Sequence, residues 1–254
     1  EEEMIHLLGG QPNTGVANTY GMGNLPEYGV PNVMTADGPA GLRIQPQCGV
    51  TTTAWPCATL VACTWDPEAA EAVGAAGAKE VKENNIGIWL TPAVNIHRSP
   101  LCGRNFEYYS EDPLVAGKTG AAAVRGIQSQ HIGASVKHFA FNNKETDRKD
   151  SDSRVSERAA REIYLKAFEI IVKEADPYTI MSSYNLVNGV HTSESRELLT
   201  NILRDEWGFR GIVTTDWWTH GEHYTPVLRG KQTGETYEYL KQMILVIQKC
   251  KFSE

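Results

Sequence analysis

The stretch ASVKHFAF, residues 134–141, is decisive for the fold, because it is a short and largely apolar run that contains Lys137 and His138. Runs of this length are typical of buried strands. Five other runs have the same character: Asn32–Ala36, Leu60–Thr64, Gly87–Val94, Tyr178–Tyr184 and Gly211–Asp216. Their apolar residues are continuous instead of alternating, as in parallel strands that are covered on both faces. We therefore expect six parallel strands.

Helical patterns lie between these runs. The segment Asp66–Asn84 opens with an aspartate that can cap a helix, followed by Pro67 at the first helical position. The segment Ser156–Glu174 carries apolar residues at helical spacing. Three further helices are expected at Pro113–Gln130, Glu194–Asp205 and Thr233–Lys251.

Strand followed by helix, repeated without a β-hairpin signal, predicts an α/β protein of the TIM-like (β/α)8 barrel type. About six strand–helix units can be recognised, against the eight of a closed barrel. The sequence leaves open whether the barrel is incomplete, lacking its late strands, or whether stretches of it lie outside this chain. We expect residues 1–254 to form a single domain.

Composition excludes several classes of function. The net charge of −7 with scattered Lys and Arg argues against a nucleic-acid partner, and no apolar stretch is long enough for a membrane helix. No secretory leader is visible at the start, which favours a cytoplasmic protein. Five cysteines without a CxxC pair and isolated histidines predict no metal and no cofactor. A homo-oligomer is compatible with the sequence.

Polar residues stand at the carboxyl ends of the expected strands, where parallel α/β folds collect their ligands. A hexose needs hydrogen-bond acceptors, which Asp37 can supply, and donors, for which we assign Arg104, Lys137 and His138. Asp216 follows the last strand and is suited to stand beside the anomeric carbon as the nucleophile of a retaining glycosidase.

Each of these residues also has a purely structural interpretation. Asp216 can be the cap of a following helix, and Asp37 can belong to a turn. Lys137 and His138 can belong to a structural ion pair, and Arg104 can hold its own loop through a nearby glutamate. Two of the side chains that we assign to the pocket, Met181 and Tyr184, can be core residues, and Trp217 can serve packing alone. Their shared placement at strand ends favours a common site.

Five motifs resemble those of glycoside hydrolase family 3, the β-glucosidase group, in the order and near the spacing of that family. They are TADGPAGLR (35–43), GRNFEYYSEDP (103–113), KHFAFNN (137–143), IMSSYNLVNG (180–189) and LRDEWGFRGIVTTDWW (203–218). The resemblance implies a retaining double displacement with Asp216 as nucleophile. It also implies that seven residues bind the glycosyl unit or line its pocket: Asp37, Arg104, Lys137, His138, Met181, Tyr184 and Trp217.

The resemblance further implies hydrolysis of terminal, non-reducing β-D-glucosyl residues. A β-xylosidase, a dual glucosidase/arabinosidase and a catalytically silent sugar-binding barrel remain alternatives. In the glucosidase branch the acid/base is a glutamate from a separate α/β sandwich domain, which nothing in this chain resembles. We therefore expect a second domain or chain to supply it, with Glu222 as the nearest local candidate. Arg104, Lys137 and His138 are expected to keep Asp216 ionised.

Overall fold

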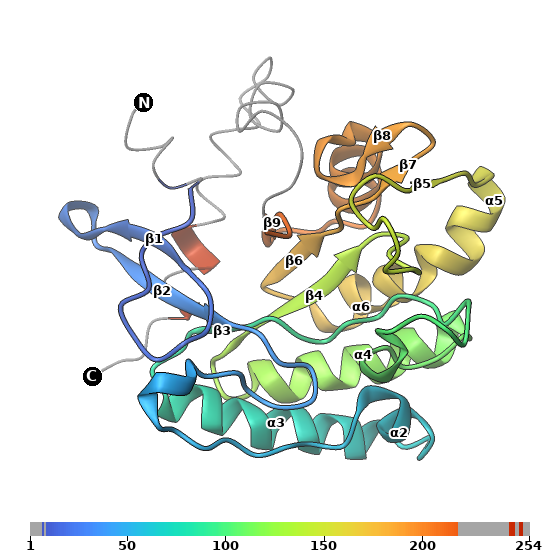
Figure 1. The fold of residues 1–254 in the computed structure, drawn as a ribbon. Helices are drawn as coiled ribbons and strands as arrows, with labels where there is room; N and C mark the ends of the chain where they lie inside the picture. The colour runs from blue at the N-terminus through green and yellow to red at the C-terminus, as the bar shows by residue number, and fades with distance from the viewer. Residues whose placement is uncertain (1–6, 8, 218–243, 247–248, 251–254) are drawn as a thin grey trace.

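The computed structural model describes residue 7 and residues 9–217, 244–246 and 249–250. Its main sheet has the strand order β1-β2-β3-β4-β6-β9, and pairing is parallel from β2 to β9. The parallel strands are β2 (Val30–Ala36), β3 (Ile88–Trp89), β4 (Gly133–Phe139), β6 (Thr179–Ser182) and β9 (Ile212–Thr214). The sheet curls, and helices cover its outer face (Figure 1). The predicted TIM-like architecture is confirmed, as an incomplete barrel within the described residues.

The two longest helices of the described chain agree with their predicted bounds. In α3 (Pro67–Glu83) the side chain of Asp66 accepts a hydrogen bond from the N–H of Glu68, so the predicted cap is present. Helix α4 (Pro113–Gln128) is capped in the same way by Asp112. The two helices pack closely at Gly126, where a Cβ would lie 2.0 Å from a backbone carbonyl oxygen of α3. Only glycine permits this approach.

The two other expected helices within the described chain are also present, but both contain π-helical turns. The first consists of α5 (Glu157–Ala159), a π turn at Ala160–Tyr164 and α6 (Lys166–Ala175). The second is the π-helix Glu197–Glu206. Most of the expected helix Thr233–Lys251 lies outside the described residues; residues 244–246 are helical, and Val246 belongs to the same buried cluster as Ile88.

The strand predicted at Leu60–Thr64 is wrong, because this run forms helix α2 (Ala58–Ala62) and the turn after it. Val61 and Ala62 are buried, whereas Leu60 is 58% exposed. A short apolar run does not distinguish a buried strand from one turn of helix. The run Gly87–Val94 contains a regular strand only at Ile88–Trp89.

No β-hairpin signal is recognised in the sequence, but the described structure contains β-hairpins. Strand β1 (Gly21–Leu25) pairs antiparallel with β2. Farther along, β7 (Leu186–Val187) and β8 (Val190–His191) form a second hairpin, which β5 (Asp152–Ser153) extends to a three-stranded sheet. Its turn is Asn188-Gly189, with both φ angles positive at 50° and 88°. Asn-Gly is a typical signal for such a turn, so this hairpin could have been recognised.

Two apolar clusters hold the sheet in place. The larger one fills the space between the sheet and the outer helices, where Phe139 of β4 makes edge-to-face contacts with Phe168 and Trp207 at centroid distances of 5.2 and 5.9 Å. The smaller one lies on the other side of the sheet and includes Leu90 and Met181. Within the described part of the chain, no helix has the length and apolar character needed to cross a membrane.

Candidate active site

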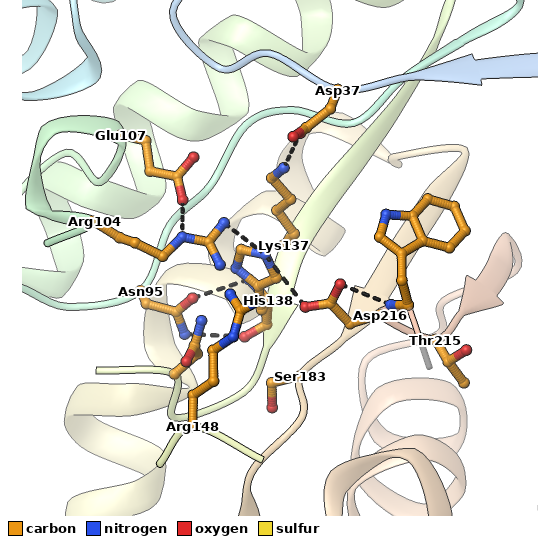
Figure 2. A network of polar contacts seen from close by, with 12 residues as sticks. Asp37, Asn95, Arg104, Glu107, Lys137, His138, Arg148, Ser183, Thr215 and Asp216 are labelled. Carbon is orange, nitrogen blue, oxygen red and sulfur yellow. Dashed lines mark hydrogen bonds and ion pairs between the residues drawn. The ribbon is translucent and has the colours of Figure 1, made fainter. Parts of the chain in front are cut away.

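Five predicted site residues meet at the carboxyl ends of the parallel strands. Asp37 follows β2, Arg104 lies in the loop after β3, Lys137 and His138 belong to β4, and Asp216 follows β9. Figure 2 shows their side chains directed toward one another. The parallel order of the strands accounts for this meeting, because residues that are about 180 positions apart in sequence reach the same edge of the sheet.

Lys137 and Asp37 form a buried ion pair. The lysine Nζ lies 2.5 Å from Oδ1 of Asp37, and the lysine side chain is 3% exposed. The other carboxylate oxygen of Asp37 accepts a hydrogen bond from Arg43 at 2.9 Å. Burial alone would raise the pKa of Asp37, but the charge and hydrogen bond of Lys137, with the charge of Arg43, hold that pKa below its ordinary value. Asp37 is therefore a fixed negative charge.

His138 is held by its backbone and by its ring. Its N–H donates to Oδ1 of Asn95 and its carbonyl accepts from the Asn95 amide, both at 2.9 Å. Nη2 of Arg104 donates to Nε2 of the ring at 3.0 Å, so the ring nitrogen must act as an acceptor. Burial first, and then the neighbouring positive charges, lower the pKa of His138 well below its ordinary value. His138 is therefore neutral.

Asp216 is the buried carboxylate on which these groups converge. It is 6% exposed, its Oδ1 accepts the N–H of Trp217 at 2.9 Å, and its Oδ2 lies 3.8 Å from Nε2 of His138. Burial raises the pKa of Asp216 above its ordinary value, although the N–H of Trp217 and the charges of Lys137 and Arg104 act in the opposite direction. The expectation that His138 helps to ionise Asp216 is wrong, because a neutral ring contributes no charge.

The three other predicted residues lie around this centre. Tyr184 is buried, and burial together with the charge of Asp216 raises its pKa, so its hydroxyl keeps its proton. Met181 of β6 belongs to the smaller apolar cluster, and the half-buried ring of Trp217 packs against that cluster. Trp217 also meets Tyr20 edge to face at 6.0 Å. Direct contact of Met181 and Trp217 with a substrate stays a prediction.

The structure adds two residues that the sequence analysis missed, Asn95 and Arg148. Asn95 comes directly after the run Gly87–Val94, so its place at a strand end was a usable signal. Arg148 lies in the loop after β4, and its guanidinium carbon stands 4.8 Å from the ring centroid of Tyr184. The glutamate expected to hold Arg104 is Glu107, which is 3% exposed and accepts a hydrogen bond from Nε of Arg104. Nothing in the local sequence indicated that Arg148 would reach Tyr184.

A hollow of about 620 Å³ in the described structure is not at Asp216. It is lined by Arg98, Phe141 and Tyr164 among others, beside the helical run that begins at α5. We assign the site from the convergence of buried charged groups, since these carry the chemistry and the hollow does not. Among the described residues there is no cluster of three or more His, Cys, Asp or Glu side chains arranged to hold a metal ion.

Comparison with known proteins agrees with this geometry. Residues 22–234 match the glycosyl hydrolase family 3 N-terminal domain. The chain is 64% identical over 248 residues to beta-glucosidase A of Butyrivibrio fibrisolvens, covering 98% of this chain and 30% of that protein. It is 50% identical over 198 residues to an exo-alpha-(1->6)-L-arabinopyranosidase of Bifidobacterium longum, covering 74% of this chain and 26% of that protein.

Solved structures give the same result. Beta-glucosidase 3B from Thermotoga neapolitana, in complex with alpha-D-glucose, is 39% identical with a TM-score of 0.83, covering 98% of this chain and 40% of that one. A beta-glucosidase from Bifidobacterium adolescentis is 37% identical with a TM-score of 0.88, covering 98% of this chain and 39% of that one. The chain thus spans about a third of the length of these relatives, and it belongs to glycosyl hydrolase family 3.

Proposed function

We propose that this chain is the nucleophile-bearing barrel domain of a retaining β-glucosidase, and that Asp216 is the nucleophile. The observation that carries the proposal is the buried carboxylate of Asp216 at the end of β9. Arg104, Lys137 and His138 lie near this carboxylate. The names of the relatives as beta-glucosidases support the same substrate class.

In the first step of this mechanism, a carboxylate oxygen of Asp216 forms a bond to the anomeric carbon while the bond to the leaving oxygen breaks. The leaving oxygen takes a proton from a general acid. In the second step, water gives a proton to that same group, attacks the anomeric carbon and releases glucose and the Asp216 carboxylate. Asp216 is suited to this work because burial deprives its ionised form of solvation.

The polar groups around Asp216 are suited to bind the glycosyl unit. Asp37 is an ionised acceptor, while Lys137 and Arg104 are donors whose positions are set by Asp37 and Glu107. Tyr184 keeps its proton and so offers a further donor beside Asp216. We assign substrate binding to Asp37, Arg104, Lys137 and His138, and the lining of the pocket to Met181, Tyr184 and Trp217.

We infer that the general acid comes from a second domain or chain. Three carboxylates of the described site, Asp37, Glu107 and Glu145, each lie against Lys or Arg. This is the arrangement of charged binding groups and not of a proton donor. Glu222, the local candidate, lies outside the described residues. Full turnover of an aryl β-glucoside by the 254-residue chain alone would contradict this inference.

A covalent trap tests the nucleophile directly. A 2-deoxy-2-fluoro-β-glucoside with a dinitrophenolate leaving group needs no acid in the first step, so we expect mass spectrometry to find one glycosyl group on Asp216. If the wild-type chain, alone and with its partner domain, acquires no label, the silent sugar-binding barrel becomes the better interpretation. Comparing kcat/KM for aryl glucoside, aryl xyloside and aryl arabinoside then decides between a glucosidase, a β-xylosidase and a dual glucosidase/arabinosidase. The arabinopyranosidase relative supports the last of these.

A further inference from the structure

The loop between β4 and β5 delivers a positive charge to the site. Its Arg148 lies over the ring of Tyr184, with its guanidinium carbon 4.8 Å from the ring centroid. The charge of Arg148 contributes to the lowered pKa of His138, and it opposes the rise that burial causes in the pKa of Asp216. Since Arg148 stands ten positions beyond His138 in an irregular loop, its place beside the site depends on side-chain contacts.

Glu145 makes those contacts. Its Oε2 accepts a hydrogen bond from Nη1 of Arg148 at 3.1 Å, and its Oε1 lies 3.9 Å from Nη1 of Arg104. Arg104 belongs to the loop after β3, so the one carboxylate connects two loops that are about 40 residues apart in sequence. The Glu145 side chain is 31% exposed, which places it at the edge of the buried cluster.

Charge balance gives the reason for this arrangement. Within the described site, Lys137 lies against Asp37, Arg104 against Glu107, and Arg148 against Glu145. Two guanidinium groups that are close together repel each other, and a carboxylate between them offsets that repulsion by attracting both. Glu145 occupies that place, so Arg148 can remain over Tyr184 without being displaced by Arg104.

We propose that Glu145 is a positioning residue, which acts on the reaction by holding Arg148 over Tyr184 and beside Asp216. This inference rests on the proposed function. Glu145 itself need not touch the substrate: its influence passes through Arg148. Removing Glu145 therefore has an effect only while Arg148 is present, and this condition separates a positioning role from a general role in stability.

A double-mutant cycle tests the proposal. The measured quantity is the rate constant for labelling by the dinitrophenyl 2-deoxy-2-fluoro-β-glucoside, in the chain together with its partner domain. We expect Glu145→Ala to slow labelling about 10-fold, and Arg148→Ala to slow it by a similar or larger factor. The double variant should equal Arg148→Ala within about a factor of two. Losses that multiply in the double variant refute the proposal.

A conservative variant keeps the test decisive if Glu145→Ala folds poorly. Glu145→Gln retains an oxygen that accepts from Arg148 but loses the charge that offsets the repulsion between Arg148 and Arg104, so it should be labelled faster than Glu145→Ala and more slowly than wild type. The labelling rate of Glu145→Gln should also be measured as a function of pH. The acidic limb of this profile should move to lower pH, because loss of the negative charge of Glu145 favours ionised Asp216. The groups that face Asp216 in this titration are Arg104, Lys137, His138, Arg148 and Tyr184. The positioning role is contradicted if the acidic limb of the Glu145→Gln profile stays in place and the labelling rate of Glu145→Gln is as low as that of Glu145→Ala.

The control is Glu162→Ala, which removes the carboxylate of an exposed ion pair with Arg158 on the helical run that begins at α5. It should leave the labelling rate unchanged. If wild-type protein acquires no label at all, the proposed function fails and the role of Glu145 in it fails as well. If wild-type protein is labelled and the cycle is additive, the role of Glu145 alone is wrong.

Discussion

The buried pair of Lys137 and Asp37 gives a prediction that concerns stability and does not depend on function. The lysine side chain is 3% exposed, whereas that of Asp37 is 23% exposed and is also held by Arg43. The two ends of the pair are therefore unequal. Replacing Asp37 leaves a buried ammonium group without the carboxylate that is paired with it, while replacing Lys137 leaves a carboxylate that still has Arg43 and some water.

The magnitudes follow from this difference. Breaking a buried pair by removing one partner costs about 3 to 5 kcal/mol. Asp37→Asn should fall at the lower end, about 3 kcal/mol, because the amide oxygen can still accept from the lysine. Lys137→Met fills the space of the lysine stem and leaves Asp37 paired, so it should cost about 1 kcal/mol. Arg43→Met removes a 57% exposed cation and should cost less than about 1 kcal/mol.

The assay is equilibrium unfolding of the 254-residue chain in urea, with the free energy of unfolding taken from the midpoint at a constant slope. The pH dependence gives a second check. Since the pKa of Asp37 is lowered from 3.8, its contribution is fully present above that value and is lost as the pH falls through the lower folded pKa. The gap between wild type and Asp37→Asn should close in that range. An equal or larger loss from Lys137→Met at pH 7 would refute the reasoning.

Three other perturbations have definite expected outcomes. Asp216→Asn should abolish covalent labelling but stabilise the chain at pH 7 by about 1 kcal/mol. Because the pKa of Asp216 is raised in the folded state, this gain in stability should shrink as the pH falls through the folded pKa. Equilibrium unfolding at several pH values checks this. Asn95→Ala removes both hydrogen bonds to the His138 backbone and should cost about 2 kcal/mol, with Asn95→Asp no better since its carboxylate cannot donate to the carbonyl. Gly126→Ala should destabilise by at least about 2 kcal/mol in thermal unfolding, whereas Gly103→Ala, with no atom within 4 Å of the added Cβ, should change the stability by less than about 1 kcal/mol.

The candidate site could be predicted where a residue's chemistry conflicted with its surroundings. A lysine and a histidine within an apolar run are costly to bury without partners, so Lys137 and His138 pointed to a site before any partner was known. Arg148 could not be found in this way. It is one cation among several in a charged loop, and only the path of that loop brings it over Tyr184.

The elements that could be predicted from the sequence are those whose signals are local. The cap at Asp66 and the length of α3 depend on neighbouring residues alone, as do the glycine-rich pattern of α4 and the apolar strands. The run Leu60–Thr64 was ambiguous because apolar residues alone do not specify a backbone conformation, and its burial on one side only was decided by packing against α3 and α4.

The sequence by itself determined the class of fold and the chemical inventory, because hydrophobic periodicity, caps and side-chain types are properties of short segments. Only the tertiary structure decided the electrostatic state of the site. His138 is neutral, the pKa of Asp37 is lowered and that of Asp216 is raised, although the two carboxyl groups are identical in chemistry. The physical reason is that a pKa depends on desolvation and on charges within a few ångströms, and these come from residues far apart in the chain.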